Sequence, residues 1–358
     1  MIGRLDRYVA ASVLSAIALV WAMLIALDVF MAFARELDEI GSGEYSIGGA
    51  FAYVALTIPR RAYDLFSWAA VIGGVLGLGA LAPTAELTAI RAAGMSKLRI
   101  CLAGIGGVAL LAAGVAVLGE TVAPWGDQRA HTLAVAAKSQ DRIASGETGL
   151  WAREGESLIN AKRGRATVRG LELYDVRIYQ FTANGQLQRI TQAARATHEA
   201  GRWRLYDATR MRFDPERIVT EAVPTLEWRS RLDPRVLASS VLRPRYLSSG
   251  DLRRNVAYLE RNGLDASPFE SAYWGRVFYP FNVLLLLACA LPFAFGALRS
   301  GGLSKRLFLG VMLALAWFLA QRAFINVADV YGIDFRVAHG LPALLLATWA
   351  VVYYRRYA

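Results

Sequence analysis

The chain has 358 residues, 55% hydrophobic and 19% charged, with a formal net charge of +11 at pH 7. Two cysteines, both in apolar segments, exclude a disulfide-stapled secreted domain, and three scattered histidines give no metal-ligand spacing. Apolar blocks flank a polar, arginine-rich middle, a composition typical of an integral membrane protein.

The first apolar block covers residues 8–33 and predicts a membrane span. A spanning helix needs about 20 mainly apolar residues, because the bilayer core offers no water to exposed backbone groups. The small residues on either side of Phe33 also match a signal-peptide cleavage site, but the apolar core of a signal is only about 7–15 residues long. We therefore expect an uncleaved helix.

Two further spans precede the polar middle. A second apolar region begins near Ile47, where Pro59 predicts a break before a glycine-rich span at 65–82. The third span is expected at 100–122.

The glycines of the second span fit helix packing better than nucleotide binding. Gly73 and Gly77 form a G-x-x-x-G pattern, which favours close contact between helices. A G-x-G-x-x-A pattern begins at Gly77, but no strand precedes it, so a dinucleotide site is not indicated. The sequence has no Gly-Lys pair and hence no Walker A loop, so this chain is not expected to hydrolyse ATP by itself.

A short polar segment at 83–95 separates the second and third spans and predicts a brief helix. Thr84 is expected to cap it, Glu86 to lie at its positive end, and Gly94 to end it. Two interpretations stay open: a plain connector with a capping carboxylate, or a coupling helix that docks into a cytoplasmic ATPase.

The polar middle, residues 127–265, predicts a β domain. Apolar and polar residues alternate around Trp203 and Leu205, and Asn184 with Gly185 is a strong hairpin signal. Further turns are expected at 200–201 and 214–215, so we predict a jellyroll or sandwich.

Residues 251–262 change to a helical pattern. Leu252, Val256 and Leu259 share one face, a serine at 248 or 249 is the expected cap, and Gly263 is the expected stop. A short amphipathic helix is therefore expected to lead back to the membrane.

Three spans follow the polar domain, at 278–298, 307–327 and 337–354. The predicted fold is six transmembrane helices, three and three, around an inserted β domain, with boundaries at 1–126, 127–265 and 266–358. Lysine and arginine concentrate in cytoplasmic loops, so one side of the membrane can be assigned from the basic residues of the short loops and termini. These residues are Arg4, Arg7, Arg91, Lys97, Arg99, Arg299, Lys305, Arg306, Arg355 and Arg356.

This charge pattern predicts cytoplasmic termini and a cytoplasmic 83–95 segment. The β domain is then external or periplasmic, since long domains cross regardless of their arginines. Cytoplasmic anchoring accounts for the net positive charge, and no nucleic-acid partner is expected.

Charged residues near the outer ends of the spans are the other unusual feature. Charges at membrane depth usually face a protein interior or an aqueous cavity, and together these would suit an anionic substrate. Snorkelling to the nearby interface is the alternative for any one of them. The candidates for substrate binding are Asp28, Arg35, Arg60, Arg61, Arg276 and Arg322.

Two other function classes remain open on sequence alone. A membrane-anchored periplasmic enzyme acting on envelope glycolipids is disfavoured, because the polar domain has no recognisable nucleophile–base pairing. A secondary transporter with Asp28 as its proton site is disfavoured because the middles of the other spans lack titratable partners.

At this point the whole chain resembles the LptF/LptG family of lipopolysaccharide export permeases. The resemblance lies in the three-plus-three layout and in the segments 75–82, 85–87, 91–94, 146–151 and 295–300. The sequence motifs G-L-G-x-L-A and F-G-x-L-R-S resemble the LptG branch more closely than the LptF branch. Departures are Ala85, where the family has serine, and Ala32, where the LptG pattern has a lysine; Arg35, about one turn further on, is a candidate substitute for that lysine.

The resemblance implies a heterodimer with an LptF-like permease in the inner membrane of a Gram-negative-type cell. It also implies a cytoplasmic LptB-like ATPase dimer that binds the ATP, an LptC-like bitopic protein, and a periplasmic jellyroll bridge protein; no cofactor is expected in this chain. Lipopolysaccharide would enter between the first and fifth spans of opposite subunits and pass into the β domain. The residues implied to couple to the ATPase are Glu86, Leu87, Ile90 and Arg91.

Overall fold

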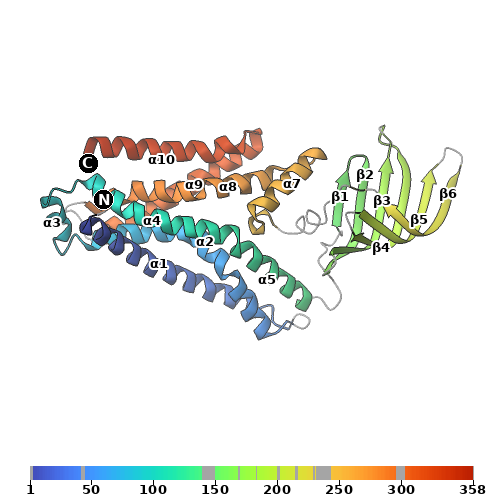
Figure 1. The fold of residues 1–358 in the computed structure, drawn as a ribbon, viewed down its shortest axis with the longest axis horizontal. Helices are drawn as coiled ribbons and strands as arrows, with labels where there is room; N and C mark the ends of the chain where they lie inside the picture. The colour runs from blue at the N-terminus through green and yellow to red at the C-terminus, as the bar shows by residue number, and fades with distance from the viewer. Residues whose placement is uncertain are drawn as a thin grey trace. The chain divides into compact units, whose positions relative to one another are not determined.

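A computed structural model of the chain divides into two compact units, each built from segments far apart in the sequence (Figure 1). The described residues are 3–41, 45–138, 150–167, 170–182, 184–199, 202–213, 217–228, 230, 243–295 and 303–357. The helical unit comprises Met1–Asp38, Ala50–Ala130 and Ser271–Ala358. The sheet unit comprises Glu39–Gly49 and His131–Glu270.

Long apolar helices make up the first unit. Its helices, including three (α2, α5 and α8) that extend into the second unit, are α1 (Arg4–Leu37), α2 (Ile47–Ala80), α3 (Glu86–Ala92), α4 (Lys97–Glu120), α5 (Val122–Lys138), α8 (Ser267–Ala290), the 3-10 turn η2 (Leu291–Phe295), α9 (Leu303–Tyr331) and α10 (Phe335–Tyr357). Within the described residues, six stretches are long and apolar enough to cross a membrane, three before the sheet and three after it. The predicted number and grouping of spans are confirmed.

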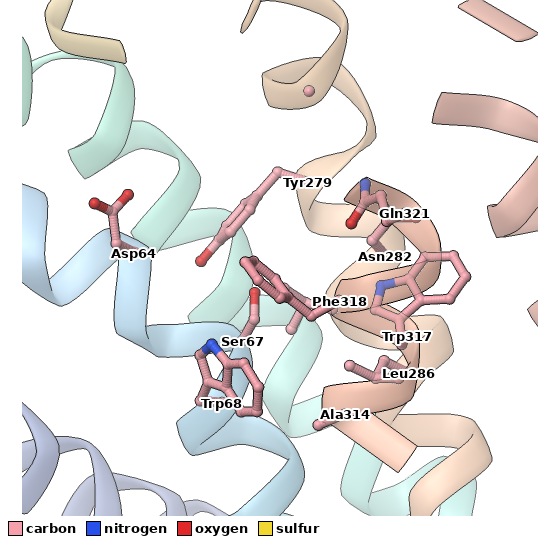
Figure 2. Close-up of a pocket in the computed structure, with 12 residues that line it drawn as sticks. Asp64, Ser67, Trp68, Tyr279, Asn282, Leu286, Ala314, Trp317, Phe318 and Gln321 are labelled. Carbon is pink, nitrogen blue, oxygen red and sulfur yellow. The ribbon is translucent and has the colours of Figure 1, made fainter. Parts of the chain in front are cut away.

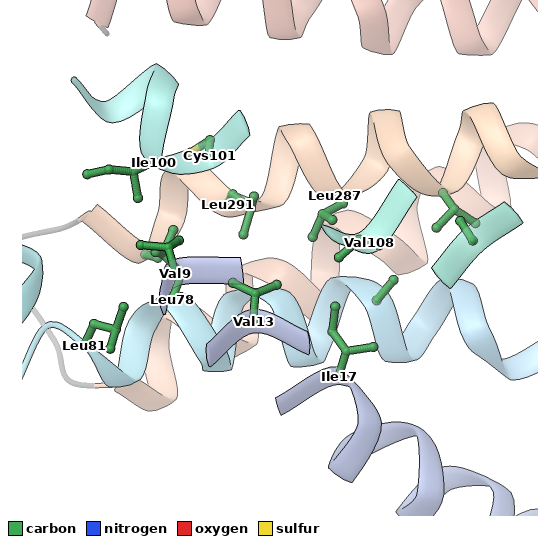
Figure 3. Packing of buried hydrophobic residues seen from close by; sticks show 14 of the residues in the cluster. Val9, Val13, Ile17, Leu78, Leu81, Ile100, Cys101, Val108, Leu287 and Leu291 are labelled. Atoms are coloured by element: carbon green, nitrogen blue, oxygen red, sulfur yellow. The ribbon is translucent and has the colours of Figure 1, made fainter. Parts of the chain in front are cut away.

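The core of the helical unit is apolar and contains side chains from α1, α2, α4 and α8 (Figure 3). Val13, Ile17, Ile100 and Leu287 are fully buried in it. These helices therefore pack as a bundle within this single chain.

The two glycines of the G-x-x-x-G pattern allow α2 to cross α1 at close range. A Cβ atom on Gly73 would lie 2.5 Å from the Cα of Ile17, and one on Gly77 would lie 2.7 Å from the backbone oxygen of Ser12. The Ser12 hydroxyl donates a 2.9 Å hydrogen bond to the Gly77 carbonyl at the same crossing. The predicted use of this motif in helix packing is confirmed.

The predicted break at Pro59 is wrong, because α2 runs without interruption from Ile47 to Ala80. Proline removes one backbone donor but is tolerated in membrane helices where neighbouring groups satisfy the freed carbonyl. The nearby Thr57 hydroxyl donates a 2.9 Å bond to the Val54 carbonyl. Gly126 of α5 approaches the Leu56 carbonyl so closely that a Cβ would lie 2.2 Å away, so another helix supports this turn.

The sheet unit contains six antiparallel strands that pair in simple sequence order, β1 to β6. The strands are β1 (Leu150–Glu154), β2 (Ser157–Thr167), β3 (Gly170–Phe181), β4 (Leu187–Glu199), β5 (Arg202–Phe213) and β6 (Ile218–Trp228). The hairpin predicted at Asn184 and Gly185 joins β3 to β4, with Gly185 at φ 77°. The turns predicted at 200–201 and 214–215 lie outside the described residues, and the jellyroll closure stays a prediction.

One row of residues interrupts the ladder in five consecutive strands. Pairing skips Lys162, Asp175, Ala194, Asp207 and Pro224, which stand opposite one another. Two of them, Asp175 and Asp207, have positive φ angles of 52° and 51°. Proline cannot donate to a ladder, and irregularities of this kind bend a sheet, which agrees with its curvature in Figure 1.

The same row shifts the alternation of side chains by one residue. On β5 the buried positions pass from Leu205 to Ala208, and on β4 from Ala193 to Ala196. One face of the sheet, the inner face, therefore stays apolar on both sides of the row. Its buried side chains are Ala152, Ile159, Ala161, Leu173, Val176, Ile178, Ala193, Ala196, Trp203, Leu205 and Ala208.

Helix α7 (Ser249–Arg261) follows the short 3-10 turn η1 (Pro244–Tyr246) and covers part of this face. Ser248 caps α7 by accepting a 3.1 Å bond from the Asp251 N–H, as predicted. Tyr258 packs into the inner-face cluster, and its hydroxyl accepts from the N–H of Arg153 and donates to the carbonyl of Arg153. Burial raises the pKa of Tyr258, and the hydrogen bond with the Arg153 backbone lowers it by a smaller amount. Helix α7 thus belongs to the sheet unit.

Candidate functional site

Arg60 of α2 is held inside the protein by an ion pair. Its Nε donates to Asp127 of α5 at 2.8 Å, and the two side chains are 6% and 2% exposed. A pair buried this deeply is strongly coupled, because either charge alone would be poorly solvated. Arg60 therefore fastens α5 to α2.

Two more of the predicted substrate-binding arginines contact carboxylates of the same chain. Arg61 donates to Asp28 of α1 at 2.5 Å. Arg276 of α8 donates to Glu120 of α4 at 3.2 Å and is largely buried. Together with Arg60, these arginines connect α2 to α5, α2 to α1, and α8 to α4. Substrate roles for these four residues, Asp28 included, stay a prediction.

Arg35 and Arg322 differ from the other predicted substrate residues. Both are exposed, and neither has an ion-pair partner among the residues that the structure describes. Arg35 lies in the last turn of α1, and Ala32, one turn before it, is only 4% exposed. Arg322 lies on α9.

The helices α1 and α9 that carry these two arginines are also the least covered of the six spans. Only 17% of the most apolar stretch of α1 and 11% of that of α9 is buried, against at least 33% in each of the other four. Large apolar side chains stand on their surfaces, including Met23, Phe30 and Leu319, which are 68%, 68% and 57% exposed. These two faces are free to meet lipid or another protein.

A cavity of about 210 Å³ lies between α2, α8 and α9 (Figure 2). Asp64 and Ser67 of α2, Asn282 of α8 and Gln321 of α9 give it polar walls between tryptophan and phenylalanine side chains. Asn282 is 8% exposed, and its Oδ1 has no hydrogen-bond partner in the described part of the chain. Sites for drug-sized ligands usually measure about 300–1,000 Å³, so this cavity is too small for a whole lipid.

The segment at 83–95 forms the short helix α3, but Thr84 does not cap it. Its hydroxyl bonds the Leu81 carbonyl, and the cap position is Ala85, at φ 58°. The chain turns so sharply there that the Leu87 N–H donates to the Leu81 carbonyl at 2.9 Å, which satisfies a helix-end donor without a side-chain cap. Gly94, at φ 90°, follows the helix as predicted.

The predicted coupling residues occupy different faces of α3. Leu87 and Ile90 are 5% and 6% exposed and pack into the core of this chain, so they anchor the helix. Arg91 is exposed. Glu86 accepts a 2.5 Å hydrogen bond from the hydroxyl of Tyr8 on α1.

Sequence reasoning missed the residues that pair with the arginines. Asp127 was assigned to the polar domain, and Glu120 to the end of a span; in fact both lie beside buried arginines. A search for opposite charges at matching distances from the ends of the spans would have found them. Tyr8 carried no such signal, because one tyrosine near a membrane surface is ordinary.

The whole chain is similar to known export permeases. A family model described as "Lipopolysaccharide export system permease LptF/LptG" matches residues 7–356. The chain is 30% identical over 356 residues to the lipopolysaccharide export system permease protein LptG of Escherichia coli strain K12, covering 98% of both chains. It is 29% identical over 347 residues to the protein of that name from Haemophilus influenzae, covering 96% of both.

Proposed function

The chain belongs to the LptF/LptG family of lipopolysaccharide export permeases, and on that premise we propose that it is a membrane subunit of an ATP-driven lipopolysaccharide exporter. The observation that carries this proposal is the length of the match to the LptG relatives, which spans the helical unit and the sheet unit alike. The chain is thus a transport subunit of the inner membrane, most like LptG, rather than an enzyme.

The entrance for substrate is assigned to α1 and α9. Acyl chains need an apolar opening, and both helices carry exposed apolar side chains. The phosphate groups of lipopolysaccharide need cations nearby, and Arg35 and Arg322 are the candidate arginines without an ion pair in the described residues. In this proposal α1 faces the fifth membrane span of an LptF-like partner. Helix α9, which is the fifth span of this chain, faces the partner's first span.

The sheet unit is assigned as the exit, on the periplasmic side. Its inner face is continuous and apolar from Ile159 to Trp203, which suits acyl chains that have left the membrane. We expect the sheet to close into a jellyroll. Handover to an LptC-like protein and a periplasmic bridge protein would follow by contact between sheet edges.

The coupling surface is assigned to α3, on the cytoplasmic side. Leu87 and Ile90 fix α3 to the bundle, which leaves Glu86 and Arg91 to contact an LptB-like ATPase dimer. ATP hydrolysis by that dimer would close the permease and drive substrate outward. Asp28, the proton site of the alternative secondary-transporter hypothesis, is occupied by an ion pair with Arg61.

Reconstitution tests the function as a whole. The chain is purified with its associated proteins, placed in proteoliposomes, and given fluorescent lipopolysaccharide and a soluble periplasmic acceptor. We expect transfer to the acceptor only when ATP is present. Transfer by this chain alone under a proton gradient would contradict the proposal.

A further inference from the structure

Among the arginines on the inner face of the sheet, Arg189 and Arg210 lie next to apolar side chains. Arg210 of β5 pairs with Thr191 of β4, and Arg189 stands two residues from Thr191, so the three share one face. Thr191 pairs in turn with Ile178, which is 2% exposed and part of the apolar cluster. Both arginines are partly exposed, so a ligand on this face can reach them.

These guanidinium groups retain hydrogen-bond donors that have no acceptor among the described residues. The Nε atoms of Arg189 and Arg210 are buried, and neither has a partner among the described residues. Arg189 makes one bond, from Nη1 to the Gln180 side chain at 3.3 Å. Buried donors are nearly always satisfied in folded proteins, so a partner supplied from outside the chain is the natural reading.

A carboxylate stands opposite Arg210 but forms no ion pair with it in the described part of the chain. Glu221 of β6 is directly opposite Arg210 in the strand register. It is exposed and makes no ion pair with Arg210 in the described structure. The arrangement differs from the Arg60–Asp127 pair, where one carboxylate satisfies a buried arginine. The inner face thus combines an apolar part with a cationic end.

We propose that Arg189 and Arg210 bind a phosphate group of a phosphorylated amphiphile whose apolar chains lie along the adjoining part of the inner face. This inference rests on the proposed function and names a binding site for that substrate within the sheet unit. Guanidinium groups match phosphate oxygens with two parallel hydrogen bonds, which a purely apolar conduit would not provide. The site holds the headgroup while the apolar side chains accept the acyl chains.

Photocrosslinking within the assembled exporter tests this site. A photoreactive phenylalanine analogue replaces Val219, which pairs with Arg212 on the neighbouring strand. The probes are lipopolysaccharide and the same material after enzymatic dephosphorylation. Arg189→Gln with Arg210→Gln should lower crosslinking of the phosphorylated probe about tenfold, because charge-assisted bonds are lost. Crosslinking of the dephosphorylated probe should not change.

Two controls separate charge from folding. Arg204→Gln alters an exposed arginine on the outer face of β5 and should leave both probes unaffected. Arg189→Lys with Arg210→Lys keeps the charges and should retain most of the binding. Equal losses for both probes would assign the arginines a structural role and overturn the inference.

The remaining outcomes are equally decisive. Unchanged crosslinking of the phosphorylated probe in the glutamine variant would overturn the inference while leaving the proposed function intact. Inorganic phosphate that competes as well as the lipid would assign the site to free phosphate instead. If the unaltered exporter gave no crosslink at Val219 and moved no lipopolysaccharide, the proposed function itself would fail.

Discussion

The Arg60–Asp127 pair shows how a single charged contact organises the helical unit. Both side chains are almost fully buried, and Arg60 Nη2 has no partner within the described residues. Removing the carboxylate would leave a cation in a poorly solvated place, which is more damaging than losing an exposed pair. The ion pair is therefore expected to stabilise the folded helical unit, independently of any role in transport.

Asp127→Asn should lower the free energy of unfolding by about 3 kcal/mol, because Arg60 would then lack a counter-charge. The measurement is denaturant titration of the purified chain in detergent, followed by circular dichroism. The matched control is Asp334→Asn, whose pair with Arg336 is more than half exposed on both sides. That variant should lose less than about 1 kcal/mol, and equal losses in the two variants would contradict the expectation.

The hydrogen bond from Tyr8 to Glu86 ties the first helix to the proposed coupling helix. Glu86→Ala should abolish coupling to the ATPase, whereas Tyr8→Phe keeps the carboxylate and loosens its position. We expect Tyr8→Phe to reduce substrate-stimulated ATP hydrolysis about twofold to fivefold, in line with one hydrogen bond of about 0.5–1 kcal/mol.

The assay compares ATPase activity of reconstituted complexes that contain equal amounts of the ATPase. Tyr331→Phe, which alters an exposed tyrosine on α9, serves as the control and should leave activity unchanged. Normal assembly and export by Glu86→Ala would refute the coupling role.

At the level of elements, the sequence was sufficient where one local rule decides the structure. Hydrophobic length located all six spans, and serine followed by glycine bounded α7 correctly. It failed where tertiary contacts override the rule. Pro59 did not break α2, because α5 packs against that turn, and Thr84 did not cap α3, because a backbone carbonyl does so.

The interrupted row in the sheet was also beyond sequence reasoning. Strict alternation predicts that every second side chain of a strand lies on the same face of the sheet. The irregularities at Asp175 and Asp207 shift this alternation by one residue in the middle of the strand. The arginines on the inner face could not be assigned to it without that shift. Of the candidate site, the arginine positions were predictable, but which of them are paired within the chain depends on how the helices cross.

The α1–α2 crossing gives a prediction at the same scale. Gly77→Ala should destabilise the chain by about 1–3 kcal/mol, because the new methyl group would overlap the backbone of α1 at Ser12. Gly106→Ala in α4 is the control, since nothing lies within 4 Å of its Cβ position. Alanine favours a helix over glycine by up to about 1 kcal/mol, so the control should be neutral or stabilising. Thermal unfolding in detergent distinguishes the two, and similar behaviour would argue against close packing.

Across the whole molecule, exposure and charge are distributed unevenly. The arginines of α2 and α8 are paired within the chain, and these helices are well covered. Helices α1 and α9 combine exposed apolar faces with arginines that have no ion pair in the described structure. In the proposed complex, a second subunit facing α1 and α9 would complete an opening lined by these apolar side chains and arginines.

Arg35→Ala combined with Arg322→Ala should therefore reduce crosslinking of lipopolysaccharide to α1 several-fold, because the phosphate groups would lose two cations at the entrance. Assembly with the ATPase should be unaffected, since neither residue lies on α3. Arg355→Ala with Arg356→Ala, at the end of α10, removes the same charge elsewhere and should leave crosslinking unchanged. If the Arg35 and Arg322 variant also crosslinked normally, snorkelling to the interface would be the better account of both arginines.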